Sequence, residues 1–134
     1  MTTSTRLPGA TGIDTGRPIT FTVDGTAYSG YVGDTIASAL IAAGRLDCGA
    51  STYLGRPRGI LGAGVEESNA LVRVHPRYPG DISESMLPAT RVPIAEGLQA
   101  DYLSGLGILD PGQDEQTYEH THVHTDVLVV GAGP

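Results

Sequence analysis

The fold is decided by residues 19–36, which read Ile19-Thr20-Phe21-Thr22-Val23-Asp24-Gly25-Thr26-Ala27-Tyr28-Ser29-Gly30-Tyr31-Val32-Gly33-Asp34-Thr35-Ile36. Apolar residues alternate with threonine from position 19 to position 23, which is typical of a half-buried β-strand. Asp24-Gly25 is a common two-residue turn, and residues 28–32 return to a β-type composition. The stretch therefore predicts a β-hairpin.

A helix is predicted directly after the hairpin. Asp34 is the candidate N-cap, because its short side chain can accept a hydrogen bond from the first helical turn. Apolar residues then follow at helical spacing (Ile36, Ala39, Leu40 and Ala43). Gly44 ends the pattern, since glycine readily adopts the left-handed conformation that closes many helices. The apolar side of the helix is expected to pack on the sheet.

Three shorter strands are expected further along the chain. Residues 45–64 are interpreted as a long irregular loop, and residues 69–74 as a strand. Residues 88–94 are interpreted as an edge strand, because Pro93 lacks the N–H that an interior strand needs, and residues 98–100 as a short final strand. A hairpin, one helix and a small mixed sheet define an α+β roll.

Both ends of the chain lie outside this roll. Residues 1–17 lack hydrophobic periodicity and are expected to form a flexible or surface-wrapping arm, so that the domain spans residues 18–100. Residues 101–125 are rich in glycine, proline and acidic residues and are interpreted as a linker. Residues 126–134 read Asp126-Val127-Leu128-Val129-Val130-Gly131-Ala132-Gly133-Pro134, a strand that runs into the first glycines of a dinucleotide-binding loop.

This ending predicts that the chain is the N-terminal piece of a longer polypeptide. The third glycine of the motif, the helix after it and the ribose-binding acid are missing. Gly131 and Gly133 are therefore the only candidate cofactor-binding residues, and only in the full-length chain. Without parallel neighbours, residues 127–130 are expected to be disordered or docked on a neighbouring molecule.

Composition limits the classes of partner. The 134 residues carry a net charge of −7, and all eight basic residues are arginines. Such a chain repels phosphate backbones and anionic lipid, so nucleic acid and membrane are disfavoured. The sequence has neither a membrane-spanning apolar run nor a signal-peptide centre, and cytoplasm is the expected location. The single cysteine, Cys48, is interpreted as a buried thiol.

Three groups of polar residues are candidate sites: His120, His122 and His124; Arg56 and Arg58; Glu66 and Glu67. The alternating histidines would point to one side of an extended chain, as metal ligands can, but a solvated linker is the favoured interpretation. The arginines could grip an anion such as a cofactor phosphate or a carboxylate, but an ion pair that fixes the long loop or docks it against the next domain is favoured. The glutamates could form an acid–base pair, but solvated turn acids are favoured. No catalytic residue and no metal site are predicted, and Asp126 is interpreted as structural.

Several blocks of sequence, in this order, carry a resemblance to a known family. They are Gly33-Asp34-Thr35-Ile36-Ala37-Ser38-Ala39-Leu40, Arg56-Pro57-Arg58-Gly59, the tail residues Tyr118, Glu119, His124 and Asp126, and residues 127–134. Together they resemble the N-terminal ferredoxin-like domain of amine-oxidising flavoenzyme subunits, in particular the alpha subunits of heterotetrameric sarcosine oxidases. The resemblance covers residues 19–134 and implies a β-grasp fold.

The resemblance also implies where an iron–sulfur cluster would lie. Relatives that carry a cluster, such as the matching subunit of hydrogen cyanide synthase, have cysteines in the loop after the Pro-Arg-Gly element. The corresponding positions here look like Gly62, Glu67 and Ala70, and none is a thiol. Because a cluster needs four thiolate-type ligands, we predict that the domain has no cluster and keeps the ferredoxin scaffold for packing.

The function that the resemblance implies belongs to a larger complex. Sarcosine oxidases convert sarcosine to glycine, hydrogen peroxide and a one-carbon unit, as formaldehyde or methylenetetrahydrofolate. FAD is expected in the beta subunit, FMN at the alpha/beta junction and NAD in the domain that begins at Asp126. Residues 1–134 would be non-catalytic, bind no cofactor tightly, and pack against the rest of the alpha subunit and the beta, gamma and delta subunits.

Two alternatives remain open at this point. One is an independent β-grasp module that lost its cluster and binds a protein partner, since β-grasp edges can accept an added strand. The other is the same type of subunit in a related dehydrogenase acting on proline, an opine or another secondary amine. Residues 1–134 do not separate the substrates, because the resemblance places amine specificity in other parts of the complex.

Overall fold

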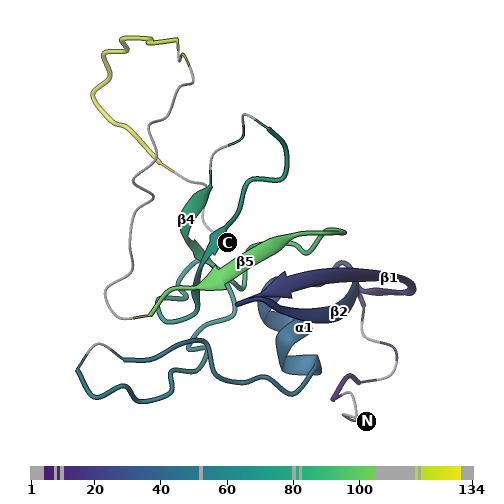
Figure 1. Ribbon diagram of the computed structural model, residues 1–134. Coiled ribbons are helices and arrows are strands. Elements are labelled where there is room, and N and C mark those ends of the chain that lie inside the picture. Colours follow the sequence, from purple (N-terminus) through teal and green to yellow (C-terminus); the bar gives the residue numbers. More distant parts are fainter. Residues whose placement is uncertain are drawn as a thin grey trace.

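The computed structural model describes residues 5–7, 9, 11–51, 53–79, 81, 83–104, 117 and 119–130. These residues form five strands and one helix: β1 (Asp14–Val23), β2 (Thr26–Val32), α1 (Ile36–Ala42), β3 (Leu71–Val74), β4 (Glu84–Pro88) and β5 (Gln99–Tyr102). The strands form one mixed sheet in the order β2-β1-β5-β3-β4, and α1 lies beside β1 and β2 (Figure 1). The predicted α+β class is confirmed.

The hairpin of β1 and β2 forms as predicted. The two strands pair antiparallel, with Phe21 opposite Tyr28. Asp24 and Gly25 have positive φ angles of 50° and 73°, which a two-residue turn of type I′ requires at both positions. β1 begins at Asp14, earlier than the alternating pattern indicates, and therefore reaches into the segment expected to be an arm.

β5, the last of the five described strands, lies at the centre of the sheet. β5 runs parallel to β1, with Val23 opposite Ala100, and antiparallel to β3, with Val72 opposite Tyr102. β4 pairs with the other side of β3 and forms one edge. The strands predicted at residues 69–74 and 98–100 are thus present with shifted ends.

The strand predicted at residues 88–94 is wrong. β4 ends at Pro88, and the following segment instead crosses to the start of α1. The carbonyl of Ala89 accepts a hydrogen bond from Ala37 N–H (3.0 Å), and the carbonyl of Val92 accepts one from Ile36 N–H (2.9 Å). These two amides lie in the first helical turn and have no partner within the helix, so a segment outside the sheet satisfies them.

The N-cap of α1 is Thr35, and the prediction of Asp34 is wrong. The hydroxyl of Thr35 accepts a hydrogen bond from Ser38 N–H (3.2 Å), and Ser38 Oγ accepts one from Thr35 N–H (3.0 Å), which together form a capping box. The side chain of Asp34 turns into the protein instead and is completely buried. Gly44 follows the helix with a φ of 83°, as predicted.

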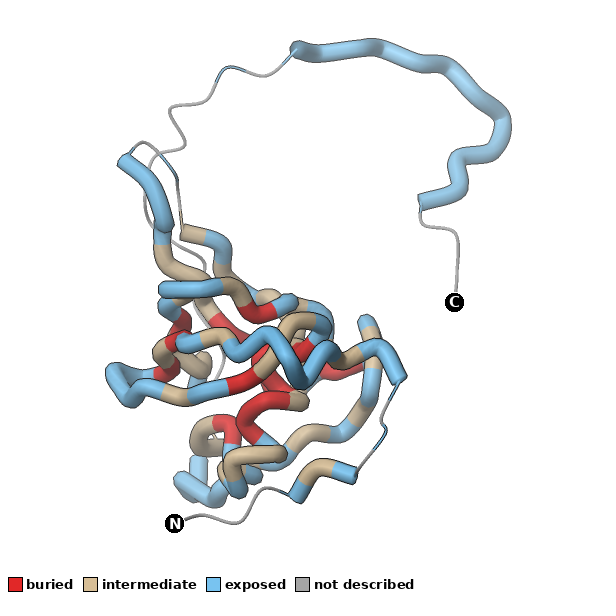
Figure 2. Tube along the Cα trace, turned by 90° about the vertical axis from the view of Figure 1, so that its right-hand side faces the viewer, coloured by how far each residue is buried: buried red, intermediate tan, exposed pale blue. Residues whose placement is uncertain are grey.

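The core lies between α1 and the sheet. Its largest completely buried apolar side chains come from β1, β3 and α1 (Phe21, Val23, Val72, Ile36 and Leu40). Figure 2 shows the buried residues gathered in the middle of the domain, with exposed chain around them. Gly30 of β2 faces the helix, because a Cβ added there would lie 3.0 Å from Ala39 Cβ.

The described part of the C-terminal segment is exposed. Residues 117 and 119–130 all have high exposure, and Val127 to Val130 are 74–88% exposed with no helix or strand assigned to them. The prediction that they are disordered or docked stays a prediction. Within the described ranges, the chain has no helix of the length and apolar character needed to cross a membrane.

Candidate functional site: an anion cage in the long loop

The loop between α1 and β3 folds around one buried carboxylate. Glu67 is only 3% exposed. Its Oε2 accepts hydrogen bonds from the backbone N–H groups of Leu61 and Gly62, both at 2.6 Å. Its Oε1 accepts from the N–H groups of Asn69 (2.6 Å) and Ala70 (2.9 Å). We call this arrangement the Glu67 cage; it comprises the Glu67 carboxylate and these four amides.

The amides decide the charge state of this carboxylate. Burial on its own would raise the pKa of Glu67, because it disfavours the charged form. The backbone N–H groups of Gly62, Ala70, Asn69 and Leu61 outweigh burial and hold the pKa below its usual range. Glu67 is therefore ionised at neutral pH, and both oxygens are engaged by donors. A carboxylate held in this way is a structural anion and a poor general base.

Glu66 behaves differently from its neighbour. Its side chain is exposed, and Oε1 accepts hydrogen bonds from Ala63 N–H (3.0 Å) and Gly64 N–H (3.1 Å). These contacts lower its pKa, the leading cause being its own backbone N–H. The interpretation of a solvated turn acid is confirmed for Glu66 and wrong for Glu67. The two carboxylates bind separate sets of amides, which does not support an acid–base pair.

The structure brings together the three positions at which the resemblance implied cluster cysteines. Gly62 and Ala70 both donate their backbone N–H groups to the side chain of Glu67. The sequence could not show this, because a buried acid and a solvated acid look alike in a polar loop. The available signal was the small-residue run Gly62-Ala63-Gly64, which lets backbone amides approach a side chain closely.

An iron–sulfur cluster does not fit the donors that this chain supplies. Such a cluster takes four thiolate-type ligands, and the chain has one cysteine, Cys48. That thiol is buried and donates to the carbonyl of Arg58 (3.0 Å), and burial followed by the charge of Glu67 raises its pKa. Among the described residues, no three His, Cys, Asp or Glu side chains are grouped as a metal site would need.

The two candidate arginines, Arg56 and Arg58, have different surroundings in the loop. Arg58 lies against the cage, where Nη2 donates to Asn69 Oδ1 (3.1 Å), and its backbone N–H and carbonyl pair with Gly49 and Cys48. Arg56 is exposed nearer the tip of the same loop. Arg58 thus contributes to fixing the loop through the neutral amide side chain of Asn69, whereas the favoured interpretation was an ion pair.

A second polar cluster joins the N-terminal segment to the helix. Arg6 donates to both oxygens of Asp34, one bond at 3.0 Å and the other through Nη2 to Oδ2. Ser38 Oγ (2.7 Å) and Tyr31 N–H (2.9 Å) donate to the same carboxylate. Burial would raise the pKa of Asp34, but Arg6 and these hydrogen bonds lower it.

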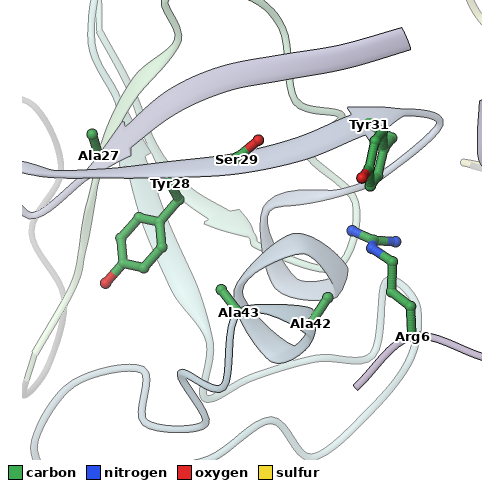
Figure 3. Close-up of a pocket in the computed structure, with 7 residues that line it drawn as sticks. All are labelled: Arg6, Ala27, Tyr28, Ser29, Tyr31, Ala42 and Ala43. Atoms are coloured by element: carbon green, nitrogen blue, oxygen red, sulfur yellow. The ribbon is translucent and has the colours of Figure 1, made fainter. Parts of the chain in front are cut away.

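A groove of about 460 Å³ opens beside this ion pair, between β2 and the end of α1. Figure 3 shows the Arg6 guanidinium below the Tyr31 ring at one end and Tyr28 at the other, with Ala42 and Ala43 of the helix forming the floor. The guanidinium carbon lies 5.1 Å from the Tyr31 ring centre, within range of a cation–π contact. Ser29 also lines the groove, and the charged group there, Arg6, is already engaged by Asp34.

The remaining sequence candidates belong to the C-terminal segment, of which the structure describes residues 117 and 119–130. His120, His122 and His124 are exposed, as are Glu119 and Asp126. Gly131, Gly133 and Tyr118 lie outside the described residues. Sequence reasoning missed the pair of His75 Nε2 and Asp101 Oδ2 (2.6 Å), which register across β3 and β5 brings together. Nothing in the sequence reveals that strand order.

Comparison with known proteins agrees with this fold. Residues 16–104 match the family described as the 2Fe-2S iron-sulfur cluster binding domain, and the chain belongs to that family. It is 61% identical over 116 residues to sarcosine oxidase subunit alpha of Corynebacterium sp. (strain U-96), covering 87% of this chain and 12% of the relative. It is 57% identical over 136 residues to sarcosine oxidase subunit alpha of Corynebacterium sp. (strain P-1), and this match covers 98% of this chain and 14% of the relative.

More distant relatives extend the comparison. Sarcosine oxidase subunit alpha of Rhizobium meliloti (strain 1021) is 34% identical over 179 residues, covering 98% of this chain and 18% of the relative. The crystal structure of L-proline dehydrogenase from P. horikoshii superposes with a TM-score of 0.53 at 19% identity, covering 74% of this chain and 18% of that one. That likeness supports the fold alone. The chain thus spans less than a fifth of the curated relatives it matches.

Proposed function

We propose that this chain is the N-terminal, non-catalytic assembly domain of a sarcosine oxidase alpha subunit. The observation that carries the proposal is the 57–61% identity to two such subunits over 87–98% of the chain. The whole enzyme would oxidise sarcosine to glycine, with hydrogen peroxide and a one-carbon unit, as formaldehyde or methylenetetrahydrofolate. FAD, FMN and NAD would be bound outside the domain, in a cytoplasmic complex with beta, gamma and delta subunits.

The polar chemistry of the domain supports a structural role. Asp34 and Glu67, the two buried acids among the described residues, are both held by several donors. The family is described by a 2Fe-2S cluster, which needs four thiolate-type ligands, and this chain has one cysteine. We therefore propose that the domain carries no cluster and takes no part in electron transfer.

The surface that would contact the rest of the subunit is the long loop. Five large apolar side chains of this loop are 65–95% exposed (Leu46, Tyr53, Leu54, Leu61 and Val65). The loop projects to one side of the sheet in Figure 1. Exposed apolar groups gathered in one segment are typical of a protein interface. We propose that the occupant is the remainder of the alpha subunit, which in the curated relatives is more than four-fifths of the chain.

The test uses the full-length subunit expressed with its partners. Tyr53→Asp with Leu54→Asp places two charges on exposed positions of the loop outside the Glu67 cage, and we expect loss of co-purifying subunits and of flavin absorbance. Tyr78→Asp, at 64% exposure in the β3–β4 connection, is the matched control and should assemble normally. Normal assembly of the double variant would contradict the docking surface. Oxidation of proline but not sarcosine by the intact complex would assign the related dehydrogenase instead.

A further inference from the structure

The cage joins two parts of the loop through one side chain. Leu61 and Gly62 lie on one side of the turn, and Asn69 and Ala70 enter β3 on the other. One carboxylate accepts from all four amides, so removing it would leave four N–H groups pointing at the same small volume. Amides that converge in this way create a local positive potential, which is the basis of backbone anion sites.

The rest of the fold holds the cage in position. Ala70 carbonyl accepts from Ala89 N–H (2.8 Å), which ties it to the segment that caps α1. Thr90 Oγ1 donates to the carbonyl of Gly64 (2.8 Å), and Asn69 Nδ2 donates to the carbonyl of Gly59 (3.3 Å). Because these contacts do not involve the carboxylate, the four amides are positioned by the loop and the sheet together.

A carboxylate and an iron–sulfur cluster both need hydrogen-bond donors from the surrounding loop, because both are negatively charged acceptors. A cluster held by thiolates is anionic, and its sulfurs accept hydrogen bonds from the protein. Here the three positions at which cysteines were expected are an amide donor at Gly62, an amide donor at Ala70 and the acceptor itself at Glu67. The chain therefore supplies the hydrogen-bond donors of an anion site together with an anion, while lacking the thiolates.

We propose that residues 61–70 form an anion-binding site whose built-in ligand is the Glu67 carboxylate, which replaces a cluster as the acceptor that closes the loop. Once emptied, the site takes a small carboxylate from solution. This inference concerns the domain alone and does not depend on which enzyme contains it.

Acetate rescue tests the site directly. Glu67→Ala keeps Cβ and removes the remainder of the side chain, which has the size and charge of acetate. The variant should melt at a lower temperature than the native chain, and its Tm should rise with sodium acetate well beyond the effect of sodium chloride at equal ionic strength, as for any ligand that binds only the folded state. Glu66→Ala removes an identical but exposed group and is the matched control.

The outcomes separate cleanly. An acetate-specific rise in Glu67→Ala alone supports the cage, and an equal response of the native chain and both variants overturns it. If Glu67→Ala does not fold, amide hydrogen exchange on the native chain decides. The four cage amides should exchange at least about tenfold more slowly than unstructured amides. Exchange of all four at the unstructured rate would also overturn the proposal.

Discussion

Replacing Asp34 by alanine should be among the most damaging single changes in this domain. The carboxylate is completely buried and accepts from Arg6, Ser38 and the Tyr31 backbone. Ser38 Oγ can still donate to the carbonyl of Thr35 (3.2 Å), so it keeps a partner. Tyr31 N–H loses its acceptor, at about 1–3 kcal/mol, and Arg6 loses two charge-assisted bonds worth about 1.5–3 kcal/mol in total.

The sum is about 2.5–6 kcal/mol of the free energy of unfolding. For a domain of this size even the lower figure corresponds to a fall in Tm of about 10 °C or more. Urea unfolding followed by circular dichroism measures the free energy, and Asp14→Ala is the control because its carboxylate is exposed and accepts only from Gly16 N–H. We expect the control to change stability by less than about 0.5 kcal/mol.

A double-mutant cycle with Arg6→Ala identifies the source of the loss. The side chain of Arg6 is 19% exposed and that of Asp34 is fully buried, so the pair is shielded from water on one side. We expect a coupling energy of about 1–3 kcal/mol between the two substitutions. Additive losses, or a loss below about 0.5 kcal/mol for Asp34→Ala, would refute the idea that the N-terminal segment is tied to the helix through this pair.

Further predictions concern close packing, capping and pH. Gly30→Ala should cost about 1–3 kcal/mol, measured by urea unfolding, because the new Cβ would lie 2.5 Å from Ile94 Cδ1. Gly33→Ala should fail to give soluble folded protein, as judged by gel filtration, because φ is +96° and the new Cβ would lie 2.0 Å from Gly12 O. Thr35→Ala should cost about 1 kcal/mol in the same unfolding assay, through loss of the capping box. The lowered pKa values of Asp34 and Glu67 stabilise the fold above the ordinary carboxyl range and lose that effect as pH falls through the folded values. As pH falls from 7, a variant that lacks either acid should therefore lose less free energy of unfolding than the native chain loses, as measured by urea unfolding at each pH.

The sequence was a good guide where structure is local. The hairpin follows from alternation around Asp24-Gly25, and the helix from apolar spacing that ends at Gly44. The N-cap was assigned to the wrong residue because Asp34 and Thr35 both suit that position. A partner far along the chain, Arg6, decides between them.

The features that the sequence missed depend on contacts that residue patterns do not reveal, whether the partners are distant or only a few residues apart. The segment after Pro88 looked like a strand, but it serves amides at the start of α1. Glu67 looked solvated because nothing in a polar loop shows that four amides converge on one side chain. The three positions that the family resemblance singled out, Gly62, Glu67 and Ala70, meet in the cage, where Glu67 accepts from the amides of the other two.

The place of β5 in the sheet sets the order in which the domain can be completed during synthesis. β5 is made last, yet it lies between β1 and β3. Until Gln99–Tyr102 leave the ribosome, the two halves of the sheet have no strand joining them, and each exposes an unpaired edge. The long sequence separation between β1 and β5 makes this closing step slow compared with formation of either hairpin. A nascent chain stalled before residue 99 would thus expose the unpaired edges of β1 and β3 to chaperones. Release of the next few residues would let β5 pair with both edges at once.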